Sequence, residues 1–554
     1  MKWKLLNNTE TANLAPRDLV DLLLENRGIA AADRERFLNP QLDLEDICSL
    51  LPDEELVKAR ELIYRAIEHN RPVIIHGDYD VDGLCASAVL WEAIYRGLGY
   101  PLARPFIPHR INHGYGLSVP SLEEVGKISR QLSSQPPLLI TVDCGISAVS
   151  EVKQAKREGY EVILTDHHVP GNIRPAADVI LHTSKLSGTG VAWVLAHFLL
   201  EDKLEQEAYL DLVALATIAD LVPLIGPNRP LVKSGLAALS STPRVGLQEL
   251  FQKAGIKDKV LTSYHVGWII GPRLNAAGRI DHALEGLRLL ATRDRVQAGK
   301  LADFLERRNR QRQLLTDKAF RQALEMTDRI NQPLPVLAHP QWHEGVIGLV
   351  AAKIMQRFGR PAIAIARGAE ISKGSARSPD NFNLIELFQH LKKTVKSFGG
   401  HPRAAGFSLA SDKISLFAQE IQEVVKDKFN LKSAEPELKI DLGLNAAFLT
   451  LDLVRLLEKL SPFGIGNPRP VFSTPKLRAF GVKKVGDRGQ HLKLQLQNGL
   501  TGQLFSAIGF NLGDLAYQLN EGAVVDVAYQ VEEDNYYQKP RLQLKIKDIK
   551  VSTA

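Results

Sequence analysis

The residues with the clearest chemical potential lie within one heptapeptide that holds one histidine and three aspartates, namely His76, Asp78, Asp80 and Asp82. Residues 73–75 are a β-branched run and predict a buried strand before the cluster, and residues 84–91 predict a helix after it. The cluster is therefore expected at the carboxyl end of a strand, where open α/β sheets place their ligands. Three carboxylates this close repel one another unless a cation neutralises them. The alternative is a polar turn in which Asp acts only as turn former and helix cap.

Two further predicted strands are followed by residues of the same kind. Residues 137–142 predict a strand followed by Asp143, and residues 161–164 predict a strand followed by Asp166-His167-His168. Strands that alternate with helices in this way predict a parallel sheet with helices on both faces. Because the carboxyl ends of such strands meet at one rim, these side chains are expected to lie close together.

Asp220 supplies one more carboxylate after the apolar stretch 211–218, although an Asp in this position can also be a simple helix cap. The resulting mixture of imidazoles and carboxylates suits Mn²⁺ or Mg²⁺ better than a thiolate-bound metal. The number of ligands suffices for two ions that share one carboxylate. Two metals ~3.5–4 Å apart can activate a water and stabilise both oxygens of an in-line phosphoryl displacement.

The composition is that of a globular chain of two to four domains: 554 residues, 45% hydrophobic and 24% charged. The formal net charge of +6 favours an acidic partner only weakly. Three widely spaced cysteines, Cys48, Cys85 and Cys144, indicate a reducing compartment and no thiolate zinc site. The first ten residues lack the apolar core of a signal peptide, and no apolar run reaches the ~18 residues of a membrane span. These features predict a cytoplasmic protein.

Residues 281–330 contain little Gly or Pro and predict one or more helices. Lys and Arg outnumber Asp and Glu in this part of the chain, most densely in residues 306–312. This pattern favours a connector between two domains whose basic side borders a nucleic acid. A solvated helix face is the alternative.

A second α/β unit is predicted beyond residue 331, with strands at 335–338 and 361–365 and a helix over 345–357. Its motifs 374–378 and 399–406 combine small residues with Ser, Arg and His. That combination suits a phosphate or a sugar-phosphate strand, and tight packing at turns is the alternative.

Alternating polar and apolar residues at 491–497 and 541–547 predict two half-exposed strands near the C-terminus. Because Lys and Arg outnumber Asp and Glu there, a small β-barrel with a basic face fits. Phe505 and Tyr529 are candidates for stacking on nucleic-acid bases, although the pattern favours core positions for both.

Eight motifs together resemble the DHH phosphoesterase superfamily, and their order most resembles its bacterial single-strand-specific 5′→3′ DNA exonucleases. The motifs are His76-Gly-Asp-Tyr-Asp-Val-Asp-Gly83, Asp143-Cys-Gly145, Thr165-Asp-His-His168, Gly271-Pro-Arg-Leu-Asn-Ala-Ala-Gly-Arg279, Trp342-His-Glu-Gly-Val-Ile-Gly348, Gly374-Ser-Ala-Arg-Ser378, Gly399-Gly-His-Pro-Arg-Ala-Ala-Gly406 and Ser461-Pro-Phe-Gly-Ile-Gly-Asn-Pro468. The resemblance covers roughly residues 50–550. It implies an α/β fold class: a parallel-sheet DHH domain and a DHHA1 domain, joined by a long helical connector and followed by an OB-fold β-barrel.

Residues 1–50 carry few strong signals and are interpreted as an N-terminal extension that packs on the domain after it. The resemblance divides the rest into a DHH phosphoesterase domain (51–280), a helical connector (281–330), a DHHA1 domain (331–430) and an OB-fold nucleic-acid-binding domain (435–554).

The resemblance also implies roles for individual residues. One metal would be held by His76, Asp80 and Asp143, and the other by Asp82, Asp143, His167 and Asp220. Asp78 and Asp166 would orient the ligands, and His168 would face the scissile phosphate, so that His168, Asp143 and Asp78 form the catalytic set.

Substrate contacts are implied by the same resemblance. Candidates for holding the terminal 5′-phosphate are Arg110, Ser375 and Arg377. Candidates for lining the cleft are Arg273, Asn275 and Arg279, with His343 and His401 nearby in roles that the sequence does not separate.

The implied function is hydrolysis of single-stranded DNA in the 5′→3′ direction to 5′-mononucleotides, by two Mn²⁺ or Mg²⁺ ions, in DNA repair and recombination. Single-stranded DNA is the implied partner of a monomeric enzyme, with a single-strand-binding protein and a helicase as candidate protein partners. The alternatives are a phosphoesterase of short oligonucleotides or cyclic dinucleotides, a small-substrate pyrophosphatase and an inactive scaffold. The β-region after residue 435 argues against small substrates, and the complete ligand set argues against the scaffold.

Overall fold

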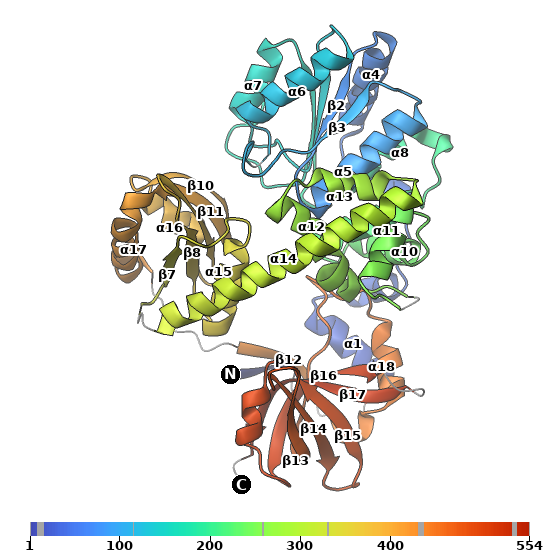
Figure 1. Ribbon diagram of the computed structural model, residues 1–554. Helices are drawn as coiled ribbons and strands as arrows, with labels where there is room; N and C mark the ends of the chain where they lie inside the picture. Colours follow the sequence, from blue (N-terminus) through green and yellow to red (C-terminus); the bar gives the residue numbers. More distant parts are fainter. Residues whose placement is uncertain are drawn as a thin grey trace. The chain divides into compact units, whose positions relative to one another are not determined.

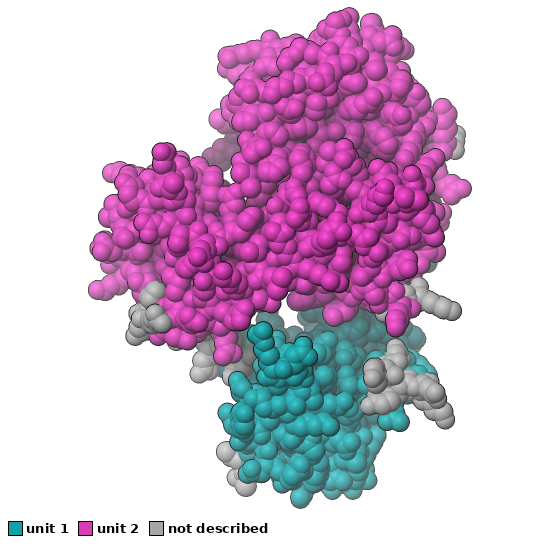
Figure 2. Space-filling view, viewed as in Figure 1, with its two compact units in different colours: residues 1–42, 223–233, 435–554 teal, residues 43–222, 234–434 magenta. Residues whose placement is uncertain are grey.

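The computed structural model describes residues 2–7, 16–114, 116–257, 260–328, 332–429, 437–534 and 540–552. The chain forms two compact units, which Figure 2 distinguishes by colour. One unit contains Met1–Leu42, Pro223–Lys233 and Glu435–Ala554, and the other contains Asp43–Val222 and Ser234–Ala434. The expected boundary before the C-terminal domain, at residues 430–436, lies outside the described residues.

The first sheet of the larger unit is wholly parallel, as the alternation of strands and helices predicts (Figure 1). Its strand order is β3-β2-β4-β5-β6. The strands are β2 (Val73–His76), β3 (Ala103–Phe106), β4 (Leu138–Val142), β5 (Glu161–Asp166) and β6 (Val179–His182). Every residue of β2 and β4 is buried, which explains why these strands are continuous apolar runs.

The helices that follow these strands include two that are almost entirely buried, α5 (Val81–Trp91) and α8 (Gly188–Leu200). The apolar stretch 211–218 forms another buried helix, α9 (Leu210–Ala219). The other helices of this region are α3 (Leu44–Cys48), α4 (Asp53–Glu68), the π-helix η3 (Glu92–Gly97), α6 (Val119–Leu132), α7 (Val149–Arg157), α10 (Asn228–Ser240) and α11 (Val245–Lys253).

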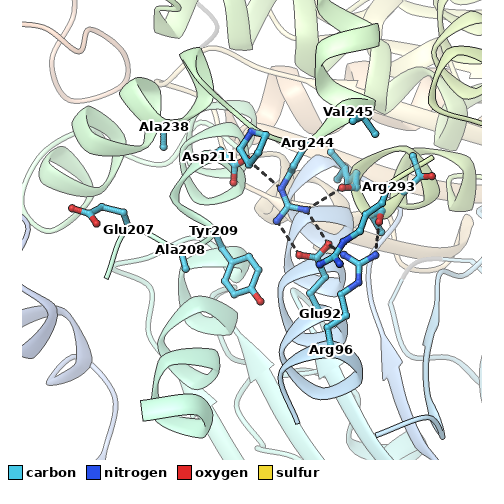
Figure 3. Close-up of a pocket in the computed structure, with 14 residues that line it drawn as sticks. Glu92, Arg96, Glu207, Ala208, Tyr209, Asp211, Ala238, Arg244, Val245 and Arg293 are labelled. Atoms are coloured by element: carbon cyan, nitrogen blue, oxygen red, sulfur yellow. Dashed lines mark hydrogen bonds and ion pairs between the residues drawn. The ribbon is translucent and has the colours of Figure 1, made fainter. Parts of the chain in front are cut away.

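An ion cluster joins the ends of α5 and α9, and it also lines a cavity of about 500 Å³ (Figure 3). Arg244 donates from Nη1 and Nη2 to the two carboxylate oxygens of Glu92, each at 3.0 Å, and from Nε to Asp211 Oδ2 at 3.2 Å. Glu92 follows α5, and Asp211 lies in the first turn of α9. Removing one partner of a buried ion pair leaves the other charge unpaired. The cluster therefore ties the end of α5 to the start of α9.

The connector consists mainly of one long helix, α14 (Arg295–Asp328), in agreement with the predicted helical region. It is preceded by the π-helix η5 (His265–Ile270), α12 (Gly271–Ile280) and α13 (Leu284–Ala291). The basic run 306–312 lies within α14.

The second α/β sheet is mixed, with the order β10-β11-β9-β8-β7 and only β7 and β8 parallel. Its strands are β7 (Val336–His339), β8 (Ala362–Ala366), β9 (Ile371–Arg377), β10 (Val395–His401) and β11 (Ala404–Ala410). Its helices are α15 (Ile347–Phe358), α16 (Leu384–His390) and α17 (Ile414–Lys428). The two small-residue motifs therefore lie largely on paired strands, β9 and the β10–β11 hairpin, rather than only in turns.

The smaller unit contains a closed barrel of five strands, because β13 pairs with both β14 and β16 while β17 joins β15 to β16. The strands are β13 (Phe472–Val485), β14 (His491–Asn498), β15 (Leu504–Gly509), β16 (Val524–Asp534) and β17 (Arg541–Val551). Phe505 and Tyr529 are both buried in its core, so the core interpretation of these aromatics is right.

The N-terminal segment belongs to this barrel unit, so the expectation that it packs on the domain after it is wrong for the described part of residues 1–42. Strand β1 (Lys2–Asn7) pairs in parallel with β12 (Glu437–Gly443). Helix α1 (Pro16–Asn26) buries Leu19 and Leu23 in the same core as the barrel strands. The sequence specifies the apolar face of such a helix but not the distant segment that covers it.

Among the described residues, no helix combines the length and the apolar composition that crossing a bilayer requires.

Candidate metal centre

The candidate ligands lie at the carboxyl ends of three adjacent parallel strands. His76 is the last residue of β2, Asp143 follows β4, and Asp166 ends β5 directly before His167. Asp143 adopts a left-handed φ of 58°, which Asp tolerates better than most residues. The strand order thus brings residues almost a hundred positions apart to one rim, as expected from the sequence.

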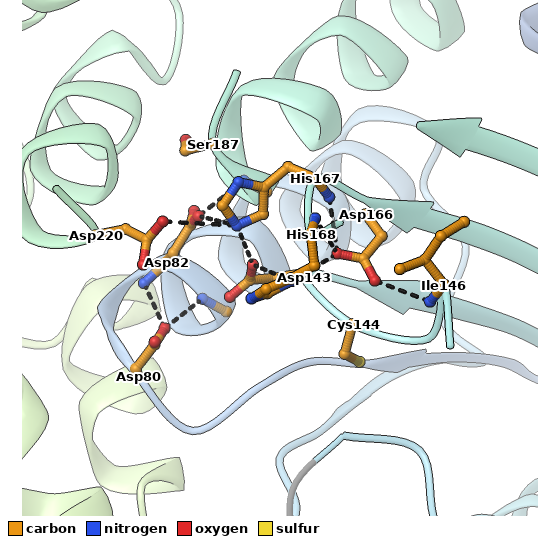
Figure 4. Close-up of polar contacts among 12 residues, drawn as sticks. Asp80, Asp82, Asp143, Cys144, Ile146, Asp166, His167, His168, Ser187 and Asp220 are labelled. Atoms are coloured by element: carbon orange, nitrogen blue, oxygen red, sulfur yellow. Dashed lines mark hydrogen bonds and ion pairs between the residues drawn. The ribbon is translucent and has the colours of Figure 1, made fainter. Parts of the chain in front are cut away.

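The four residues expected to hold the second metal come together around His167 (Figure 4). Its Nε2 lies 3.1 Å from Asp143 Oδ1, 3.5 Å from Asp220 Oδ2 and 3.7 Å from Asp82 Oδ2. Asp220 caps the end of α9, so its capping position and its place in this group are compatible.

The start of α8 holds the Asp82 carboxylate in place. The backbone amides of Gly188 and Thr189 each donate to it at 2.7 Å. These two residues were not expected at the site, although a Ser-Gly-Thr-Gly segment before an apolar helix is a recognisable signal for an anion-binding N-terminus.

A second group consists of Asp78, Asp80 and Asp143, whose ligand atoms lie within 4.8 Å of one another. Asp143 thus belongs both to this group and to the group around His167, as a carboxylate that bridges two metals must. Asp78, expected only to orient ligands, takes a place in this group. His76 is in none of the groups, but its Nε2 is buried at the base of the same site.

Four of these side chains have buried polar atoms with no hydrogen-bond partner among the described residues. They are His76 Nε2, Asp78 Oδ1, Asp143 Oδ1 and His167 Nε2. Leaving buried polar atoms unpaired is costly, and two divalent cations that share Asp143 would give these atoms partners. The donor set of carboxylate oxygens and imidazole nitrogens fits Mn²⁺ or Mg²⁺.

Without a cation, burial and mutual repulsion shift the pKa of four of the carboxylates upward. Burial and then the neighbouring carboxylates raise the pKa of Asp78, Asp80 and Asp143, and they raise the pKa of Asp220 to about 8. Burial lowers the pKa of His76 to about 4, so its imidazole is neutral and able to bind a metal. These shifts describe a site built for positive charge.

His168 is oriented by Asp166 rather than by the metal groups alone. Its Nδ1 lies 2.8 Å from Asp166 Oδ1, and Asp166 also accepts from the backbone amides of Ile146 and His167. Burial alone would lower the pKa of His168, but the hydrogen bond and the charge of Asp166 outweigh it and raise the pKa to about 9. The His401 ring stacks beside His168, with centroids 6.3 Å apart. A protonated His168 can donate to a phosphate oxygen.

Arginines from four separate segments converge near this site. Arg279 is half-buried, and its pKa falls to about 10 because of desolvation and then the nearby charges of Arg110, Arg312 and Arg377. Arg377 donates to Ser375 Oγ at 3.0 Å, and Arg110 lies over the Tyr79 ring at 5.4 Å. Guanidinium groups gathered in this way are suited to a phosphate.

The remaining substrate-contact candidates, Asn275, Arg273 and His343, each have different hydrogen-bond partners. Asn275 Oδ1 accepts from the Val81 amide, next to Asp80, at 3.1 Å. Arg273 donates to Glu306 at 2.7 Å, and its charge also contributes, after burial, to lowering the pKa of Arg312 at the edge of the arginine group. His343 Nδ1 accepts from the Gly345 amide, and Gly345 packs directly on the Arg279 carbonyl.

The chain matches three protein families in succession. The DHH family N-terminal domain matches residues 72–217, the DHHA1 domain matches residues 331–427 and the RecJ OB domain matches residues 440–548.

Curated relatives match nearly the whole chain. A single-stranded-DNA-specific exonuclease RecJ from Bacillus subtilis is 34% identical over 99% of this chain and 70% of its own length. The Escherichia coli protein of the same name is 32% identical over 98% of this chain and 97% of its own length.

Solved structures give the same result. The crystal structure of RecJ in complex with Mn²⁺ from Thermus thermophilus superposes with a TM-score of 0.83 at 30% identity, covering 100% of this chain and 80% of that one. The Mg²⁺ complex from the same organism gives a TM-score of 0.77 at 28% identity, covering 100% and 79%.

Proposed function

The chain belongs to the RecJ family of single-stranded-DNA-specific exonucleases, and we propose that it degrades single-stranded DNA from the 5′ end to 5′-mononucleotides. It is a metal-dependent nuclease that acts on single-stranded DNA, with Mn²⁺ or Mg²⁺ as cofactor. The observation that carries the proposed polarity is the arginine group beside the candidate metal ligands, since it would hold a terminal phosphate while the next phosphodiester lies at the metal centre.

Two cations would share Asp143. His76 and Asp80 would complete one site, and Asp82, His167 and Asp220 the other, as the distances around His167 support. When bound, the two ions supply activation of the attacking water and stabilisation of charge on the phosphate. Asp78, which lies beside Asp80 and Asp143, would orient the ligands of the metal that those two residues hold.

His168 would act on the scissile phosphate itself. In the metal-free protein its pKa is raised to about 9, which favours the protonated ring, and the Asp166 hydrogen bond fixes the direction in which it donates. A fixed donor of this kind stabilises the charge that develops on a phosphate oxygen as the 3′-oxygen leaves. His401, stacked on His168, would limit the freedom of the ring.

Arg110, Ser375 and Arg377 would hold the terminal 5′-phosphate, with Arg279 at its other side. In the protein without DNA the like charges of Arg110 and Arg377 contribute, after burial, to lowering the pKa of Arg279. A dianionic phosphate would relieve that repulsion, which supports a preference for phosphorylated ends. Asn275 and His343 would line the adjoining strand path.

The barrel would provide a further contact with the strand. Among the described residues of the barrel, Tyr517 is 80% exposed and Phe510 46% exposed, so both are accessible for base stacking. Lys484 lies 4.4 Å from the Tyr517 ring centroid and Lys545 5.1 Å from that of Phe510, so each ring has a cation beside it for the phosphate backbone. This pair replaces Phe505 and Tyr529, which are buried.

The wider context is proposed on the same basis. We propose domains at 51–280, 281–330, 331–430 and 435–554; the family matches at 72–217, 331–427 and 440–548 lie within the first, third and fourth of these ranges. A cytoplasmic monomer that acts in DNA repair and recombination, beside a single-strand-binding protein and a helicase, would suit a nuclease of this specificity.

The decisive experiment follows the degradation of single-stranded DNA labelled at either end, with Mn²⁺ and then with a chelator. Release of labelled mononucleotides from the 5′ end first, with blunt duplex spared and the chelated sample inactive, is the expected result. Release from the 3′ end first would refute the polarity, and cleavage of dinucleotides alone would indicate a small-substrate phosphoesterase.

A further inference from the structure

Trp268 is one of the most exposed large apolar side chains among the described residues. It is 74% exposed, and Tyr264, one turn earlier, is 57% exposed. Both lie in a helical run that continues without a break from residue 263 through η5 and α12 to residue 280. An indole exposed to water loses the large free energy that its burial would contribute. Exposed apolar surface of this kind marks interaction sites.

Trp268 shares a face of this helix with two residues of the candidate substrate site. Asn275 is seven residues further along and Arg279 eleven, which correspond to about two and three helical turns. Tyr264 precedes Trp268 by four residues and so extends the same stripe outward. Because residues 265–270 are π-helical and α12 begins at Gly271, Trp268 lies somewhat less than the ~16 Å from Arg279 that a pure α-helix would give along the axis.

Successive turns of the helix pass successive parts of the site. At the inner end, Arg279 lies among the charges of Arg110 and Arg377. Further out, Asn275 accepts from the Val81 amide beside Asp80.

The outer turns continue in the same direction. A Cβ on Gly271 would lie 3.5 Å from the Cβ of Ala219, the residue before Asp220. Trp268 comes next. Consider a single-stranded DNA with its terminal phosphate at the arginine group and its next phosphodiester at the metal centre. The rest of that strand would extend outward along this face of the helix.

Cationic side chains flank the outward path. Arg273 and Arg310 both donate to Glu306, which ties α12 to α14, and the Arg310 side chain is 73% exposed. Cationic side chains beside an exposed aromatic are the combination with which proteins bind single strands independently of sequence.

We propose that Trp268 is a base-stacking residue for the nucleotides on the 3′ side of the scissile bond, with Tyr264 as the next position along the strand. The occupant is single-stranded nucleic acid. The inference rests on the proposed function, because it takes the strand to run from the arginine group past the metal ligands. It gives Trp268 the role of retaining the strand between successive cleavages.

The test compares Trp268→Ala and Trp268→Phe in the full-length protein, with Asp143→Asn added for binding measurements so that the DNA stays intact. Trp268→Ala should weaken binding of long labelled strands about tenfold, and Trp268→Phe should restore most of the loss because it keeps an aromatic face. The cleavage rate of strands that reach the metal centre but are too short to reach Trp268 should be unchanged. Val296→Ala, which alters an equally exposed apolar residue (69%) on α14, serves as the control.

Intrinsic fluorescence provides a second readout. Long strands should quench the emission of the protein, and the part of that quenching due to Trp268 should be missing in Trp268→Phe. Equal loss of long and short substrates would overturn the inference, as would unchanged affinity and unchanged quenching in Trp268→Ala. These outcomes are distinct from failure of the proposed function, in which the unmodified protein would not degrade single-stranded DNA from its 5′ end.

Discussion

The Cys144 sulfur lies 3.7 Å from Nδ1 of His76 and 3.8 Å from the His76 carbonyl oxygen, in the buried base of the candidate metal centre. His76 Nε2 is the ring nitrogen without a partner, so it is the one available to a metal. A neutral imidazole that binds through Nε2 carries its proton on Nδ1. His76 therefore donates to a thiol sulfur, a weak acceptor, where metal-bound histidines usually donate to an oxygen.

Replacing Cys144 by Ala should lower Mn²⁺ affinity by about tenfold, because the buried His76 Nδ1–H loses its acceptor and the ring its orientation. Isothermal titration calorimetry on the metal-free protein measures the change. Cys144→Ser retains a donor and acceptor and should lose less. Equal affinity in the unmodified protein and Cys144→Ala would show that the sulfur contact does not orient the ligand.

Asp143→Asn should reduce the rate of single-stranded DNA degradation by at least about 100-fold, since Asp143 is common to the groups on both sides of the site. It should also reduce the number of Mn²⁺ ions bound per chain in equilibrium dialysis. Asp452→Asn makes the same chemical change at an exposed position and should leave both quantities unaltered. Near-normal turnover in Asp143→Asn would refute the shared-ligand arrangement.

The stabilisation of the protein by Mn²⁺ should grow as the pH rises from about 5.5 to 7.5. Burial and then Asp82 and Asp80 raise the pKa of Asp220 to about 8, so the metal-free folded protein holds protons that the unfolded chain releases near pH 4. Raised carboxyl pKa values mean that the metal-free protein loses stability as the pH rises through this window. Cations compete with those protons and therefore gain most at the upper end.

Thermal unfolding with chelator and with Mn²⁺ at each pH measures that difference. Asp220→Asn should flatten the pH dependence of the metal-free protein, because the substituted amide does not titrate. A Mn²⁺ effect that is the same at both ends of the range would contradict the assignment.

Arg377→Ala should lower kcat/KM on 5′-phosphorylated strands by about tenfold or more, and on 5′-hydroxyl strands much less, because its guanidinium is placed for the terminal phosphate. Single-turnover assays on the two kinds of end give the comparison. Arg455→Ala removes an exposed arginine paired with Asp452 and is the matched control. Equal losses on both substrates would remove the role in recognising the end.

Tyr517→Ala should weaken binding of long single strands several-fold without affecting the melting temperature, since the ring is exposed. Phe505→Ala should instead destabilise the barrel unit by about 3–5 kcal/mol, because it empties a core position. Fluorescence anisotropy and thermal unfolding separate the two effects. A loss of DNA affinity in Phe505→Ala at full stability would reverse these roles. Point variants are preferable to deletion of the barrel, which would also uncover α1.

The sequence by itself determined the elements that carry the chemistry. Strand β2, helix α5 and the ligands between them are specified by neighbours within about fifteen residues, through β-branched runs, helix-forming residues and a short acidic turn. Because parallel strands in an α/β sheet present their carboxyl ends at one rim, Asp143 and His167 could be assigned to the same site before any distance was known.

Only the tertiary structure decided which distant groups meet. It paired β1 with β12 across the length of the chain, and it buried Phe505 while leaving Tyr517 in water. It also placed the sulfur of Cys144 against His76 and paired Arg273 with Glu306 through a hydrogen bond. Local patterns reveal that a side chain is apolar, basic or capable of hydrogen bonding, but its partner depends on how separate elements pack, and that packing is set by the whole chain.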